Sequence, residues 1–134
     1  MASFVLDASI TLSWFMLNEK KQYKLLDKAI TEGAIVPIIW GLEISNSLLY
    51  AERRGRIDVS QRQSAIYLLK EIGIKVDRTS LEHIWSETMD LAERHCLTIY
   101  DASYLELALR YDLPLATLDK ALKLASRQEK IITL

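Results

Sequence analysis

The sequence predicts an α/β fold, a three-layer α/β/α sandwich around a central, mainly parallel sheet of four to five strands. Short apolar runs alternate with longer segments of helical periodicity, which is typical of a parallel sheet covered on both faces. Only four glycines and two prolines occur among 134 residues, which argues against a turn-rich all-β domain. The length, with no repeat or linker, predicts a single domain over residues 1–134.

In the first half of the chain, turn and capping signals separate the expected elements. Gly33 ends a helix before an apolar strand, and Gly73 ends another. Ser60 and Gln63 have the spacing of a capping box, which predicts a helix start. In order, we expect a strand over 4–6, helices over 8–17 and 20–31, a strand over 34–36, and helices over 41–54 and 60–72. The helix over 20–31 is expected to bury Tyr23, Leu26 and Ile30.

In the second half, Thr79 and Glu82 form a possible capping box, and Pro114 ends an apolar helix. In order, we expect a strand over 74–76, helices over 79–95 and 101–111, a strand over 115–117, a helix over 119–127 and a strand over 131–133. The helix over 79–95 is expected to face the core with Leu81, Ile84, Trp85, Thr88, Leu91 and Ala92. The helix over 101–111 is apolar nearly all round, with a polar stripe of Ser103, Glu106 and Arg110, so most of it should be buried.

Composition excludes several classes of protein. A single cysteine allows no internal disulfide and no thiolate zinc cluster, and two histidines disfavour a histidine-rich metal site. The net charge of −1 gives no overall electrostatic signature of nucleic-acid binding. The uncharged stretches are too short to span a bilayer, and no basic segment precedes the first apolar run. We therefore expect a cytoplasmic protein with no membrane partner.

Four acidic residues follow strands or begin helices at one predicted edge of the sheet. Asp7 ends the first strand, Glu43 lies early in the helix after the second, and Asp119 follows the fourth. Asp101 begins the helix that leads into the fourth strand. Ligand sites of parallel sheets lie at the carboxyl edge, so these acids are candidate ligands of a hard cation such as Mg²⁺ or Mn²⁺. The alternative for each aspartate is an ordinary helix cap or a charge that interacts favourably with the helix dipole.

Four short segments carry a resemblance to a known family. VLDAS at 5–9, LEISNSL at 42–48, YDASYL at 100–105 and LATLD at 115–119 resemble the four motifs of the PIN-domain family. More narrowly, the sequence resembles the VapC-type toxins of toxin–antitoxin pairs, over essentially the whole chain and including RRGRI at 53–57. Each motif alone is weak, but all four in this order are specific.

The resemblance implies a metal-dependent endoribonuclease that hydrolyses RNA phosphodiester bonds. In that family the four acids bind Mg²⁺ or Mn²⁺, and these roles map onto Asp7, Glu43, Asp101 and Asp119, with one or two ions. Around them, the residues expected to orient ligands or water are Ser9, Asn46 and Thr117. The resemblance also implies a small antitoxin protein as partner and a homodimer.

Two further groups have competing interpretations. The arginines Arg53, Arg54 and Arg56 either compensate a helix dipole or contact RNA phosphates. The apolar run over 14–17 is either core or, in part, a surface for a partner.

Two other functions remain as alternatives. The first is a PIN-like interaction module without catalysis, against which the four intact acids argue. The second is a phospho-acceptor receiver domain, which would have paired acids after the first strand, whereas Asp7 stands alone there.

Overall fold

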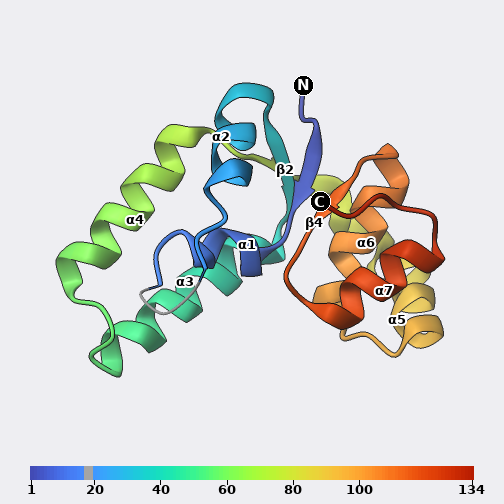
Figure 1. Cartoon of the computed structure of the whole chain (residues 1–134). Coiled ribbons are helices and arrows are strands. Elements are labelled where there is room, and N and C mark those ends of the chain that lie inside the picture. The colour runs from blue at the N-terminus through green and yellow to red at the C-terminus, as the bar shows by residue number, and fades with distance from the viewer. Residues whose placement is uncertain (17–19) are drawn as a thin grey trace.

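A computed structural model describes residues 1–16 and 20–134, and in these residues a single four-stranded sheet forms the centre (Figure 1). The strands are β1 (Phe4–Leu6), β2 (Ala34–Pro37), β3 (Lys75–Asp77) and β4 (Leu115–Ala116). Every pairing is parallel, in the order β3-β2-β1-β4. The predicted α/β fold is therefore confirmed.

β1 is the centre of the sheet. Val5 pairs with Ile35 of β2 on one side and with Leu115 of β4 on the other. All residues of β1 and β2 are buried, as expected for strands that helices cover on both faces.

Helices cover both faces of this sheet. Figure 1 shows the first four helices on one side of the strands and the last three on the other. The helices are α1 (Ala8–Ser13), α2 (Tyr23–Glu32), α3 (Ile39–Arg53), α4 (Val59–Ile72), α5 (Met89–His95), α6 (Ile99–Tyr111) and α7 (Lys120–Gln128). None of the described helices is both long enough and apolar enough to cross a membrane.

The expected fifth strand over 131–133 is reduced to one isolated bridge between Leu115 and Thr133. Leu115 donates to the carbonyl of Ile132 and accepts from the N–H of Leu134. Ile131, however, donates its N–H to Ser126 at the end of α7. The last residues therefore divide their hydrogen bonds between a helix end and the edge of β4, and the ladder stays short.

Two details of the helices before β3 differ from the prediction. In α2, Tyr23 and Ile30 are exposed, because the helix packs through Ala29 with Leu25 and Leu26 half-buried. Gly33 ends it as predicted, with φ +84° and with the carbonyl oxygen of Met1 only 3.1 Å from where a Cβ would lie. That close approach leaves no room for a larger residue.

The capping box of α4 is also different. Asp58 and Gln61 form it, rather than Ser60 and Gln63. The Asp58 carboxylate accepts from the Gln61 N–H at 2.7 Å, and the Gln61 side chain accepts from the Asp58 N–H at 2.8 Å.

The segment predicted as one helix over 79–95 divides into three. A 3₁₀ segment (Arg78–His83) and a π-helical segment (Ile84–Thr88) precede α5. Thr79 donates its hydroxyl to Asp77 and caps no helix. Because each change of helical pitch rotates the face that side chains present, Leu81 is exposed and Trp85 is 91% exposed, whereas Thr88 and Leu91 are buried as predicted.

Candidate active and metal site

The four predicted acids lie where the chain leaves or re-enters one edge of the sheet. Asp7 directly follows β1, and Asp119 precedes α7 just beyond β4. Glu43 lies near the start of α3, which follows β2, and Asp101 lies in the first turn of α6. In Figure 1 this is the lower edge, where β1 leads into α1 and where α7 begins.

Asp7 is held by two hydroxyl groups from distant segments. It is only 4% exposed, and its Oδ2 accepts from Ser9 Oγ and from Thr117 Oγ1, both at 2.6 Å. Ser9 Oγ in turn accepts from the N–H of Leu118 at 2.9 Å, and Thr117 Oγ1 accepts from that of Asp119 at 3.0 Å. Burial raises the pKa of Asp7 despite the two hydroxyl donors. The hydroxyls thus connect Asp7 to the loop that carries Asp119.

Burial and neighbouring negative charges raise the pKa values of Glu43 and Asp101. Burial raises the pKa of Glu43, and the negative charges of Asp7 and Asp101 raise it further. Burial also raises the pKa of Asp101, with added contributions from the charges of Asp119 and Asp7. In the described part of the chain no salt bridge includes any of the four acids. These carboxylates therefore form an acidic cluster whose repulsion is relieved by no salt bridge of the described residues.

The helix-cap interpretation holds for one aspartate of the three. Asp119 caps α7, because its Oδ1 accepts from the N–H of Leu122 at 2.8 Å. Asp7 makes no capping hydrogen bond to α1. Asp101 lies inside α6, whose cap is Thr98, with the hydroxyl of Thr98 accepting from the Asp101 N–H at 3.1 Å. Capping therefore does not account for Asp7 and Asp101, although Asp101 in the first turn of α6 is placed to interact favourably with the helix dipole.

The donor chemistry suits a hard divalent cation, because the cluster offers carboxylate and hydroxyl oxygens and an uncompensated negative charge. Across residues 1–16 and 20–134, however, no group of three or more His, Cys, Asp or Glu side chains is already gathered around one point as a metal site. Carboxylates that repel one another stay apart until positive charge arrives. Binding one ion to three or more of these carboxylates would therefore require their side chains to move.

Sequence reasoning missed one residue of this edge, Tyr104. Its phenol is completely buried and donates to Oε1 of Glu43 at 2.6 Å. Tyr104 lies three residues after Asp101 in α6, so both face the same side of the helix. That spacing on an apolar helix was the available signal.

Asp77 also follows a strand but belongs to a different arrangement. Its Oδ2 accepts from Arg110 Nη2 and from Ser80 Oγ, both at 2.7 Å, and Thr79 donates at 3.0 Å. Burial alone would raise the pKa of Asp77, but these donors outweigh it and hold the pKa far below its usual range. Arg110 also binds Glu106, so part of the predicted polar stripe of α6 is a buried ion network.

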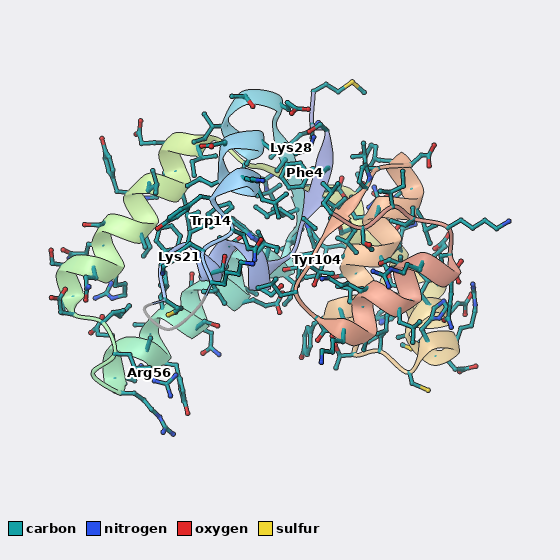
Figure 2. The ribbon with its side chains drawn as sticks, viewed as in Figure 1. Phe4, Trp14, Lys21, Lys28, Arg56 and Tyr104 are labelled. Atoms are coloured by element: carbon teal, nitrogen blue, oxygen red, sulfur yellow. The ribbon has the colours of Figure 1, made fainter. Side chains whose placement is uncertain are left out.

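The remaining predicted residues make no described hydrogen bond to the acids, although Asn46 lies one helical turn after Glu43 on α3. Asn46 is exposed and makes no hydrogen bond to the four acids within the described residues. It lies in the wall of a cleft of about 340 Å³, whose other lining residues are Leu12, Met16, Ser47, Tyr50, Ala51 and Arg56. Arg53, Arg54 and Arg56 are exposed at the far end of α3, and Arg54 stacks on Tyr50 at 4.6 Å. Figure 2 shows Arg56 at the junction of α3 and α4, distant from Tyr104. At 1.5 Å per residue, the helix separates Glu43 from Arg53 by about 15 Å.

The apolar run over 14–17 is core where it is described. Trp14 is buried and donates its indole N–H to the carbonyl of Gln22 at 3.0 Å, so the partner-surface interpretation is wrong for this residue. Phe15 and Met16 are half-buried against the core, and Leu17 lies outside the described residues. Exposed apolar groups gather instead around a cavity of about 200 Å³, whose lining includes Leu42, Leu81 and Tyr100.

Comparison with known proteins agrees with this architecture. The family model of the PIN domain matches residues 4–128. PAE2754 from Pyrobaculum aerophilum is similar in structure, with a TM-score of 0.72 and 25% identity over 98% of this chain and 89% of that chain. FitAcB from Neisseria gonorrhoeae has a TM-score of 0.66 and 15% sequence identity over 98% of this chain and 96% of that chain. A toxin–antitoxin complex from Klebsiella pneumoniae has a TM-score of 0.62 and 20% sequence identity over 87% of this chain and 87% of that chain. A comparison with curated proteins gave no significant match.

Proposed function

This chain belongs to the PIN domain family, and we propose that it is a divalent-metal-dependent endoribonuclease that acts as the toxin of a toxin–antitoxin pair. The observation that carries the proposal is the acidic cluster: Asp7, Asp101 and Glu43 each have a raised pKa, and no described salt bridge compensates them. Groups with perturbed pKa values cluster at functional sites, and a bound cation would relieve this repulsion.

Asp7, Glu43, Asp101 and Asp119 are the residues that would hold one or two Mg²⁺ or Mn²⁺ ions. When bound, such an ion neutralises charge on the phosphate and lowers the pKa of a water molecule. The proposed hydrolysis would add a water molecule across the P–O3′ bond, which would leave a 3′-hydroxyl and a 5′-phosphate. No 2′-hydroxyl takes part, so a preference for RNA would come from groove shape or base contacts.

The protein's own side chains orient the Asp7 carboxylate and keep RNA phosphates away from the metal-free site. Ser9 and Thr117 fix one oxygen of Asp7, so this carboxylate needs little reorganisation when a cation arrives. The cluster also repels RNA phosphates, so a scissile phosphate would approach only when added positive charge is present. Cleavage should therefore depend strictly on a divalent ion.

The arginines at the end of α3 would bind RNA beyond the scissile phosphate. In the described residues Arg53, Arg54 and Arg56 take part in no salt bridge, whereas Arg62, Arg94 and Arg110 are all paired. Exposed guanidinium groups without a described salt bridge, which begin about 15 Å along α3 from Glu43, suit phosphates of neighbouring nucleotides.

The test is cleavage of a panel of structured RNAs with Mg²⁺, with Mn²⁺ or with a chelator. Wild type should cleave only with the metal, and Asp7→Asn should be inactive. Asp112→Asn is the matched control, because Asp112 is exposed and has φ +53°, a backbone conformation that asparagine also tolerates. Metal-independent cleavage, or full activity of Asp7→Asn, would refute the proposal.

The proposed partners are a small antitoxin protein and a second copy of the chain. They are supported by the resemblance to VapC-type toxins and by the exposed apolar side chains Leu42, Leu81, Trp85 and Tyr100. Co-expression with the product of a short adjacent reading frame, followed by co-purification and a cleavage assay, tests the antitoxin. A complex that forms but leaves cleavage undiminished would contradict it.

A further inference from the structure

Tyr104 places a phenol against the candidate site from inside the protein. Figure 2 shows Tyr104 in the interior, on α6 where this helix meets the sheet. The side chain is 0% exposed, and its hydroxyl donates to Glu43 Oε1 at 2.6 Å. Tyr104 and Glu43 are 61 residues apart, so this contact joins α6 to α3.

Packing does not require this hydroxyl. A phenylalanine would fill the same apolar volume and would bring no polar group into the core. The bond to Glu43 is the only hydrogen bond between Tyr104 and another side chain in the described residues, and it is also the only one that Glu43 accepts there. The hydroxyl therefore donates its proton to Glu43, while its oxygen lies near the backbone N–H of Ala8, the residue after Asp7.

Glu43 needs such a partner because its neighbours repel it. It is half-buried, and the charges of Asp7 and Asp101 act on it from two other segments. Without the phenol, a flexible glutamate beside two carboxylates would turn toward solvent. With the phenol on Oε1, the side chain is held facing the cluster, and Oε2 has no hydrogen-bond partner among the described residues.

We propose that Tyr104 is a positioning residue that holds Glu43 ready to bind the divalent ion, an inference that rests on the proposed function. Tyr104 itself touches neither the ion nor the RNA. Its contribution is to reduce the movement that Glu43 must make when the ion binds.

The test measures Mn²⁺ binding to the full chain by calorimetry, without RNA. Tyr104→Phe should weaken Mn²⁺ binding by about tenfold, the lower end of the usual effect of removing a partner of a metal ligand. Tyr111→Phe is the matched control, because Tyr111 lies on the same helix and its phenol is 3.4 Å from a different carboxylate, Asp77 Oδ1. It should bind Mn²⁺ as wild type does. Thermal melting with a chelator shows that each variant is folded.

A second variant separates positioning from packing. In a Glu43→Ala background, the change Tyr104→Phe should leave the thermal shift produced by millimolar Mn²⁺ unaltered, since the phenol then has no carboxylate to hold. An equal loss in both backgrounds would overturn the positioning role. If Tyr104→Phe binds Mn²⁺ with an affinity within about twofold of that of wild type, the positioning role is overturned as well. Absence of Mn²⁺ binding by wild type would overturn the proposed function too, which distinguishes the two failures.

Discussion

Ser9 and Thr117 are 108 residues apart, yet their hydroxyls lie 3.4 Å from each other and donate to the same oxygen of Asp7. Each hydroxyl also accepts from a backbone N–H of the loop after β4, Ser9 from Leu118 and Thr117 from Asp119. The loop that carries Asp119 is thus attached to the end of β1 through two side chains. Both contacts contribute to stability as well as to the shape of the site.

Thr117→Val removes one of these hydroxyls with little change of volume. The substitution leaves Asp7 with one hydroxyl donor and the Asp119 N–H without its acceptor, so the free energy of unfolding should fall by about 1–3 kcal/mol. Urea denaturation measures the change. Thr31→Val is the control, because Thr31 is exposed and its hydroxyl donates only to a carbonyl of its own helix. Equal effects of the two substitutions would show that the Asp7 contacts add nothing to stability.

Neutralising one acid should stabilise the metal-free protein while it abolishes cleavage. In Asp101→Asn, one source of repulsion on Glu43 disappears, and a partly buried charge is replaced by a neutral amide. We expect an unfolding free energy higher by roughly 1 kcal/mol in chelator and no detectable cleavage with Mn²⁺. Asp112→Asn should change neither property. Cleavage retained by Asp101→Asn would remove this residue from the mechanism.

The stability of the metal-free protein should fall as pH rises above about 4. The folded protein raises the pKa of Asp7, Glu43 and Asp101, so in this range it binds more protons than the unfolded chain does. The contribution of these three groups to stability is therefore largest near pH 4 and declines as they ionise at higher pH, whereas the lowered pKa of Asp77 removes stability only below about pH 4. Melting temperatures at pH 5 and pH 7.5 in chelator measure the decline, and Mn²⁺ should reverse it. The decline should be smaller in Asp101→Asn; an identical decline in both proteins would contradict this origin.

The placement of the four acids along one edge of the sheet was predictable because it depends on topology. Apolar strands between helices imply a parallel sheet, and its carboxyl edge gathers whatever follows each strand. The contact of Tyr104 with Glu43 was not predictable in the same way, because it depends on how α6 and α3 pack. The capping box of α4 was ambiguous for a local reason: Asp58 with Gln61 and Ser60 with Gln63 both have the required spacing. The segment over 78–88 is 3₁₀- and π-helical rather than α-helical, and it begins next to Asp77 and Thr79. Both residues bind Arg110, which lies far away in the sequence, so no local sequence pattern reveals these bonds.

Removing arginines at the end of α3 should weaken RNA binding without changing the chemical step. For Arg53→Ala combined with Arg56→Ala we expect a higher KM, an unchanged kcat, and a salt dependence of binding that is weaker by about 0.7 per lost phosphate contact. Lys24→Ala combined with Lys70→Ala is the control, because both lysines are exposed on other helices and the net charge changes equally. Cleavage kinetics and fluorescence anisotropy across salt concentrations give the three quantities. If the lysine variant matches the arginine variant, only net charge matters.

Arg110 is the residue whose loss should destabilise the fold most. Its guanidinium donates to Glu106 Oε2 at 2.7 Å, to Asp77 Oδ2 at 2.7 Å and to Thr79 at 2.7 Å, and the two carboxylates are almost fully buried. In Arg110→Met both acids stay buried without a cation, so the free energy of unfolding at neutral pH should fall by about 3–5 kcal/mol.

The pH dependence of this loss follows from the same two acids. In wild type the lowered pKa of Asp77 contributes stability above its unfolded value of about 4, and that contribution disappears as pH falls. In Arg110→Met the buried acids should instead bind protons more readily than in the unfolded chain, so the variant gains stability as pH falls. The difference between the two proteins, measured by urea denaturation, should therefore shrink from pH 7 toward pH 4. Arg78→Met, on the adjoining 3₁₀ segment, is the control, because Arg78 is exposed and takes part in no described salt bridge. A loss in Arg110→Met that is independent of pH would show that packing, not charge, explains the effect.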